Sequence, residues 1–296
     1  MYTAFYKLRE TPFSQSVNPK FTWLSDKQLK TLAAFKQKYI DKKGFFLITG
    51  DAGTGKTAFI KKLLAEIESK TIVATVTDPD LEKLDFFNWL SLEFNMNVMF
   101  KSKGAFLTRF KRFLLEAHQK NINVSLIIDD AHRINPELIE EILTLSNIEQ
   151  AGNKLMSIFF VGHSGFNKLL QKKQNSALKQ SINAHFRLNP LTEEEIVQLI
   201  LYRLKAAGAQ AEIFSSRAYH EIYQFSAGYP RLAVNICDRA MMAGCVSETH
   251  VIDKDLIIKC GKDLQIGGIK REREGIDHLN DIPGSKGPAG KAIKEK

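Results

Sequence analysis

Cysteine is scarce in this sequence, and its scarcity excludes two kinds of crosslinked fold. The 296 residues include three cysteines, Cys237, Cys245 and Cys260. An odd number without CxxC spacing argues against a disulfide framework and against a zinc site. We interpret them as reduced thiols, because free cysteine is most often simply buried.

Long hydrophobic runs are also missing. No apolar stretch approaches the ~18 residues that a membrane-spanning helix needs. The segment 1–10 mixes aromatic side chains with Lys7 and Arg9 and has no apolar central region, so it does not form a signal peptide. These features predict a cytoplasmic protein.

The remaining composition is that of an ordinary globular protein, with 44% hydrophobic and 25% charged residues. The length suffices for one large domain or two smaller ones, each with its own core. A net charge of +9 fits affinity for nucleic acid, anionic lipid or an acidic partner, and it equally fits a basic surface that keeps the protein in solution. Charge alone does not decide between these.

Short apolar runs alternate with amphipathic stretches through the first two thirds of the chain. The runs are mostly β-branched or aromatic and read as buried parallel strands: 45–49, 71–76, 124–128 and 157–161. The amphipathic stretches lie at 58–69, 85–95, 105–119 and 136–145. This alternation predicts an α/β fold, a parallel sheet with helices on both faces.

The pattern changes after Pro190. Thr192, with Glu195 three residues later, forms a capping box that opens a helix. Helical patterns follow with no strand-like run between them, at 215–225, 231–245 and 253–264. We therefore predict a small all-helical domain after the α/β domain.

The expected division of the chain has three parts. Residues 1–190 form the α/β domain and residues 191–265 the helical domain. After these, large apolar residues give way to glycine, proline and alternating charges. Such a composition predicts a disordered tail at 266–296.

Residues 50–57 read Gly-Asp-Ala-Gly-Thr-Gly-Lys-Thr and fit the pattern G-x-x-x-x-G-K-[ST] in full. The glycines let backbone N–H groups turn inward toward phosphate oxygens, and the following helix presents its positive end to the same anion. Lys56 is predicted to reach the β- and γ-phosphates of ATP, and the Thr57 hydroxyl to ligate Mg²⁺. The residues predicted to bind the nucleotide are Gly50, Asp51, Ala52, Gly53, Thr54, Gly55, Lys56, Thr57 and Ala58.

A second acidic element accompanies this loop. The apolar run 124–128 ends in Asp129 and Asp130. Carboxylates at the end of a strand beside a phosphate-binding loop lie where Mg²⁺ and the attacking water are held. We predict that Asp129 holds the metal and that Asp130 orients the water. A strand followed by a helix cap is the alternative interpretation.

Two further polar residues are candidates for the same site. His163 follows the run 157–161 and would lie at the same edge of the sheet, although a surface histidine fits the spacing nearly as well. Arg231 closes a Gly-Tyr-Pro-Arg turn that begins a helix of the second domain. An arginine fixed at a helix start is suited to pairing with phosphate, and a surface arginine is the equal alternative.

Together these motifs resemble the GspA/ExeA-type AAA+ ATPases, which are associated with type II secretion and pilus systems. The resemblance covers the chain from residue 1 to about residue 265. Besides the phosphate loop it rests on a series of short motifs in the same order, among them the aromatic start FYKLRETPF at 5–13, DDAH at 129–132, YRL at 202–204 and GYPR at 228–231.

The resemblance implies an AAA+ α/β domain with a helical lid, and a homo-oligomer. It places Asp129 at the Mg²⁺ site, His163 at the first sensor position and Arg231 at the sensor arginine of the lid. The N-terminal aromatic segment would lie near the adenine. A location in the cytoplasm, or at the inner membrane through a partner, follows from the same resemblance.

Three departures from the family pattern bear on the mechanism. Asp130 stands where the family has a longer glutamate, and His163 where it has glutamine. Ser181 stands at the position of a candidate arginine finger, which can be worth about 10³- to 10⁵-fold in turnover. Nucleotide binding is expected, whereas fast hydrolysis would need a substitute such as Lys179 or Arg187.

Three functions remain open on the sequence. The first is an ATP-dependent assembly or regulatory factor of a secretion or pilus system, acting as an ATP hydrolase. The second is a DNA-dependent ATPase of the transposition-regulator type, which the sequence pI of about 9.3 favours. The third is a nucleotide-gated scaffold that hydrolyses ATP weakly, which the serine at 181 favours.

Overall fold

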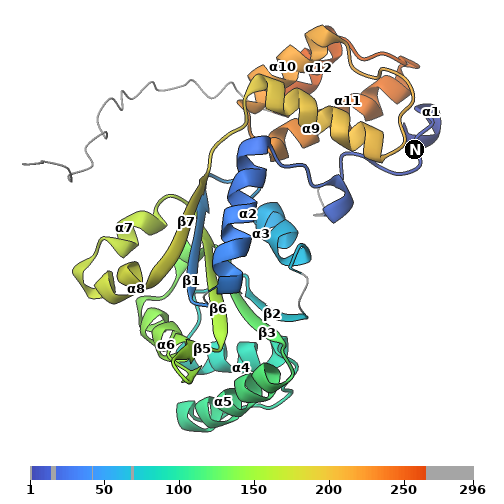
Figure 1. The fold of residues 1–296 in the computed structure, drawn as a ribbon. Helices are drawn as coiled ribbons and strands as arrows, with labels where there is room; N and C mark the ends of the chain where they lie inside the picture. Colours follow the sequence, from blue (N-terminus) through green and yellow to red (C-terminus); the bar gives the residue numbers. More distant parts are fainter. Residues whose placement is uncertain (1, 15–17, 42, 68–69, 265–296) are drawn as a thin grey trace, which may run out of the picture.

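The computed structural model describes residues 2–14, 18–41, 43–67 and 70–264 (Figure 1). The predicted tail at 266–296 lies outside these residues. Figure 1 shows an α/β part below and a helical part above, joined by the chain that leaves strand β7. Within the described residues, no helix is both long and apolar enough to cross a bilayer.

Parallel strands form the centre of the α/β part. In the order in which they pair they are β2 (Thr71–Val76), β3 (Asn123–Ile128), β6 (Met156–Gly162), β1 (Phe45–Gly50) and β7 (Ile182–Leu188). Every neighbouring pair in this sheet is parallel. The predicted fold class is confirmed, and the four predicted strands match the observed ones to within one residue at each end.

Strand β7 was not predicted from the sequence. It is an edge strand that pairs only with β1 among the described strands. Its polar residues Asn183, His185 and Arg187 alternate with apolar ones, and two of them are exposed. The strand therefore lacks the continuous apolar character that marks the buried strands of this sheet.

Helices cover both faces of the sheet, as predicted (Figure 1). Side chains of β1 alternate between the two faces: Phe45 and Leu47 enter one core cluster, and Phe46 and Ile48 the other. One face is covered by α2 (Asp26–Asp41) and α3 (Lys56–Ala65). The other is covered by α4 (Lys83–Glu93), α5 (Lys103–Gln119), α6 (Pro136–Ser146), α7 (Phe166–Leu170) and α8 (Ser176–Ser181).

The helical part consists, among the described residues, of α9 (Glu193–Ala206), α10 (Ser216–Ser226), α11 (Pro230–Val246) and α12 (Lys254–Asp263). The predicted capping box opens α9: the Glu195 N–H donates to the Thr192 hydroxyl at 3.3 Å, and the Thr192 N–H donates to the Glu195 carboxylate at 2.9 Å. These helices enclose a core of their own, separate from those of the sheet.

The N-terminal segment packs against the helical part rather than against the sheet. Helix α1 (Tyr2–Phe5) contacts α11, and the hydroxyl of Tyr2 donates to the carboxylate of Asp238. Tyr6 and Phe13 lie in the core of the helical part. The aromatic start of the sequence is therefore explained by packing between the two ends of the chain.

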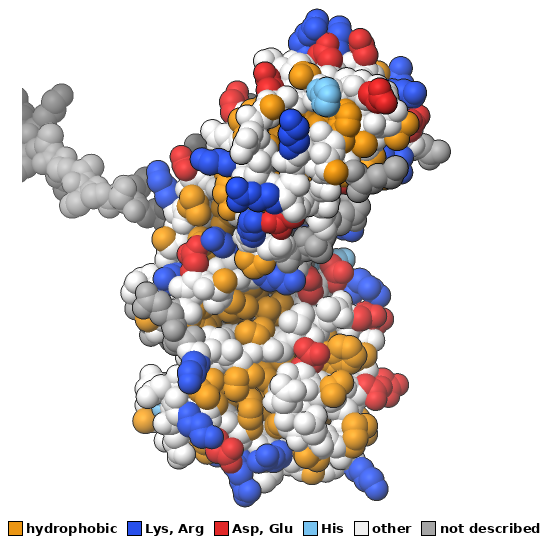
Figure 2. All heavy atoms as spheres, turned by 90° about the vertical axis from the view of Figure 1, so that its right-hand side faces the viewer, with side chains coloured by type: hydrophobic (Ala, Val, Ile, Leu, Met, Phe, Trp, Pro, Cys, Tyr) orange, Lys and Arg blue, Asp and Glu red, His pale blue; other side chains and the backbone are white. Residues whose placement is uncertain are grey.

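Charges of both signs are mixed over the surface shown in Figure 2. On that face Lys and Arg side chains alternate with Asp and Glu side chains and with apolar patches, without forming one basic band among the coloured residues. The net positive charge is thus dispersed on this face.

Candidate phosphate-binding site

The loop between β1 and α3 is shaped by its glycines. Gly53 and Gly55 have φ angles of +85° and +95°, a region that favours glycine. A Cβ atom added to Gly50 would lie 2.6 Å from the carbonyl oxygen of Leu188 on the neighbouring strand. The Thr54 hydroxyl donates to the carbonyl of Asp51 at 2.8 Å and closes the turn. The loop therefore requires glycine for conformation at two positions and for space at a third.

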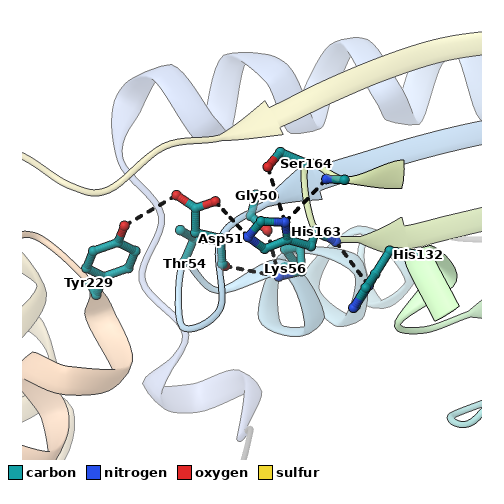
Figure 3. A network of polar contacts seen from close by, with 9 residues as sticks. Gly50, Asp51, Thr54, Lys56, His132, His163, Ser164 and Tyr229 are labelled. Atoms are coloured by element: carbon teal, nitrogen blue, oxygen red, sulfur yellow. Dashed lines mark hydrogen bonds and ion pairs between the residues drawn. The ribbon is translucent and has the colours of Figure 1, made fainter. Parts of the chain in front are cut away.

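Lys56 lies across this loop (Figure 3). Its Nζ donates to the carbonyl oxygens of Gly50 at 2.9 Å and Asp51 at 3.0 Å. Burial lowers the pKa of Lys56, and the charges of Asp129 and Asp130 partly oppose that shift. A cation held this way, partly withdrawn from water, is placed to interact strongly with an anion in the loop.

The first of the two carboxylates at the end of β3, that of Asp129, reaches the start of α3. The Thr57 hydroxyl lies 3.5 Å from Oδ2 of Asp129, and Oδ1 of Asp129 accepts the N–H of Asp130 at 2.9 Å. Asp130 has a φ of +44°, an uncommon conformation for a residue with a side chain. Such local strain is concentrated at functional sites in proteins.

His163 also reaches the phosphate loop. Its Nε2 lies 3.3 Å from Oδ1 of Asp51, and its Nδ1 accepts the backbone N–H of Gly165 at 3.3 Å (Figure 3). Because Nδ1 accepts, a neutral His163 carries its proton on Nε2, the nitrogen that lies near Asp51. His132 lies beside it, with ring centroids 6.0 Å apart. His163 thus lies at the predicted edge of the sheet, and its side chain is also 49% exposed.

The helical part closes the site from the other side. The hydroxyl of Tyr229 donates to Oδ2 of Asp51 at 3.3 Å, and the backbone N–H of Arg231 donates to the carbonyl of Gly53 at 3.3 Å. Burial, and then the charge of Asp51, raise the pKa of Tyr229. Asp51 therefore links the loop to both His163 and Tyr229, one from the sheet and one from the helical part.

A cleft of about 640 Å³ opens in front of the loop. Its size lies in the range of small-molecule sites. Of the predicted site residues, those that line the cleft are Ala52, Gly53, Gly55, Lys56, Thr57, Ala58, Asp129, Asp130, His163 and Arg231. Thr54 lines a smaller cavity of about 80 Å³ next to it, and Gly50 and Asp51 contact Lys56. The structure thus brings the predicted residues together.

Ser181 is not part of this cleft. It ends α8, and its hydroxyl donates to the carbonyl of Ala177 at 2.8 Å. Sequence reasoning assigned no role to Tyr229, His132 or Arg203, which the structure places at the site. All three fall inside quoted motifs, but their roles depend on contacts between distant segments.

A phosphate loop after β1, a pair of carboxylates after β3 and a helical part that contacts the loop form an arrangement typical of AAA-type nucleotide-binding proteins. Residues 39–170 match the family described as "AAA domain". Most of the chain is similar to "General secretion pathway protein A" of Aeromonas hydrophila, with 29% identity over 277 residues. That match covers 92% of this chain and 50% of the relative, so the chain spans about half of its length.

Solved structures support the same fold. The Aeropyrum pernix ORC2 protein superimposes with a TM-score of 0.68 at 14% identity, covering 85% of this chain and 70% of that one. Cdc6p from Pyrobaculum aerophilum gives 0.67 at 18% identity, with the same coverage. Residues 39–170 are therefore similar to the AAA domain family, and the predicted resemblance of the chain to the GspA/ExeA type is confirmed.

Proposed function

We propose that this chain binds ATP with Mg²⁺ in the cleft between the sheet and the helical lid. The observation that carries the proposal is the convergence of Lys56, Thr57, Asp129 and Arg231 on one cleft. These residues fit Mg²⁺-ATP. Lys56 and Arg231 are cations that can bind phosphate, and the Thr57 hydroxyl and the Asp129 carboxylate are oxygen ligands of the kind that Mg²⁺ prefers.

Each residue has a role that its position supports. Lys56, now bonded to two carbonyls of the loop, exchanges them for phosphate oxygens. Thr57 and Asp129 hold the metal, which neutralises phosphate charge when bound. Arg231 forms no ion pair with any described carboxylate, so its guanidinium is available to phosphate from the lid side.

We propose further that hydrolysis is slow. Asp130 orients the attacking water, with a side chain one methylene shorter than glutamate. The Ser181 hydroxyl is engaged with its own helix and carries no charge to offer a neighbouring subunit. The loss of an arginine finger alone corresponds to about 10³- to 10⁵-fold in turnover.

For the biological role we propose a nucleotide-driven assembly factor of a secretion or pilus system, working as a homo-oligomer on the cytoplasmic side of the inner membrane. The relation to a general secretion pathway protein supports it. Residues 1–190 and 191–265 would act as two units that the nucleotide brings together. Tyr2, Tyr6, Leu8 and Phe13 would move with the second unit, because they pack in its core.

The test is steady-state ATP hydrolysis with and without duplex DNA, beside a Lys56→Ala control. Tight ATP binding with slow, DNA-independent turnover is the expected result. Turnover that DNA raises many-fold would instead support the DNA-dependent alternative. Co-purification of secretion or pilus components with the wild type, weaker with Lys56→Ala, would support the assembly role.

A further inference from the structure

Arg203 of α9 lies where two cavities meet. It lines the cleft in front of the phosphate loop, and it also lines the smaller cavity beside it. The smaller cavity has an apolar wall that includes Phe21, Trp23 and Leu191. If the phosphates of a nucleotide lie on the loop and its base lies against that apolar wall, Arg203 lies beside the middle of the nucleotide.

The guanidinium of Arg203 is only partly satisfied. One terminal nitrogen, Nη1, donates to the carbonyl of Pro12 at 3.2 Å and to that of Ser14 at 3.4 Å. Its Nε is buried and has no hydrogen-bond partner. No described carboxylate forms an ion pair with it, and burial lowers the pKa of this arginine.

A half-buried guanidinium whose Nε has no partner calls for an explanation. Arginine stays protonated in proteins, so the shift does not remove its charge. A purely structural role, holding residues 12–14 against α9, accounts for Nη1 alone. It leaves the charge and the Nε donor unexplained, and a buried polar group without a partner is rare and destabilising.

We propose that a small shift of the Arg203 side chain brings Nε into contact with the α-phosphate of the bound nucleotide, while Nη1 keeps the N-terminal segment in place over the base. The inference rests on the proposed nucleotide binding and adds a second lid arginine to Arg231. Arg203 contacts the α-phosphate, and Arg231 contacts the ligand nearer the end of the phosphate chain. Nucleotide binding is thereby coupled to the packing of residues 12–14.

The first test observes Nε directly. The ¹H–¹⁵N resonance of Arg203 Nε, assigned by its loss in Arg203→Lys, is followed while ADP is added to the full chain. The expected result is a saturable shift. A resonance unmoved at saturating ADP would overturn the proposal.

The second test compares ligands. In Arg203→Lys the affinity for ADP should fall about 10- to 100-fold, as expected for a lost hydrogen bond to a charged group. The affinity for pyrophosphate, which has no α-phosphate or nucleoside, should stay within about twofold, given that the P-loop itself is unchanged. Equal losses for both ligands would mean that the variant had disturbed the loop, and would overturn the proposal.

Ligand binding by the wild type distinguishes failure of this inference from failure of the proposed function on which it rests. If the wild type binds neither ADP nor pyrophosphate, the proposed function fails and the inference fails with it. If the wild type binds both and a folded Arg203→Lys binds ADP as tightly, the inference alone fails. Circular dichroism and urea unfolding of Arg203→Lys establish that the variant is folded.

Discussion

Replacing Gly55 by alanine should weaken nucleotide binding without any steric clash. Gly55 has φ +95° at the start of α3, and an added Cβ would meet no atom within 4 Å. The perturbation is therefore one of backbone conformation alone. Holding alanine in the left-handed region costs about 1–2 kcal/mol.

That strain is divided between stability and binding. In the free protein the loop can relax, so the free energy of unfolding falls little. Alanine also lowers the conformational entropy of the unfolded chain, and this stabilises the folded protein by about 0.4–1 kcal/mol and offsets part of the strain. To bind phosphate, the loop must return to the strained conformation. Affinity for Mg²⁺-ATP should then fall by up to the full strain, about 5- to 30-fold.

Gly104→Ala is the matched control for this experiment. Gly104 lies in α5, has no positive φ and has equally open space at its Cβ position. Its replacement should raise the free energy of unfolding by about 0.5–1 kcal/mol and leave ATP affinity unchanged. Isothermal titration calorimetry and urea unfolding measure both quantities. Unchanged ATP affinity in Gly55→Ala, or equal losses in the two variants, would refute the reasoning.

Three further predictions concern neighbouring contacts. Gly50→Ala should abolish ATP binding in calorimetry, since the new Cβ would lie 2.6 Å from the Leu188 carbonyl oxygen. Tyr229→Phe keeps the ring and removes the hydrogen bond to Asp51. Amide hydrogen exchange at the start of α11 should then accelerate, and unchanged exchange would show that this hydrogen bond does not hold the helical part to the loop. Partial burial lowers the pKa of His185 below 6.5, the value of an unperturbed histidine. The unfolded chain therefore takes up the proton at a higher pH than the folded protein, and stability is lost as the pH falls below 6.5. Urea unfolding from pH 7 to 5 should show a shallower loss in His185→Gln.

The parts of the site that could be predicted from the sequence are those specified locally. The phosphate loop and the pair Asp129–Asp130 each follow an apolar strand, so a short pattern fixes both their chemistry and their place at one edge of the sheet. The buried strands were predicted for the same reason. Their apolar runs are continuous, as expected for a parallel sheet covered on both faces.

The parts that were missed depend on contacts between distant residues. Tyr229 and Asp51 are 178 residues apart, and nothing in either segment indicates that they meet. The partners of Arg203, Pro12 and Ser14, come from the other end of the chain. Helix α2 was also missed. Its average character is polar, and its buried apolar residues, Leu32, Phe35 and Tyr39, make up a minority of the helix.

The most direct test of the central claim is calorimetric titration of Mg²⁺-ATP into the wild type, Lys56→Ala and Lys62→Ala. Lys62 lies on the same helix, at the surface, where it pairs with Glu66 at 3.6 Å. We expect one ATP per chain in the wild type, no measurable binding in Lys56→Ala and unchanged binding in Lys62→Ala. A wild type that does not bind ATP, or a Lys56→Ala variant that binds it equally well, would contradict the account.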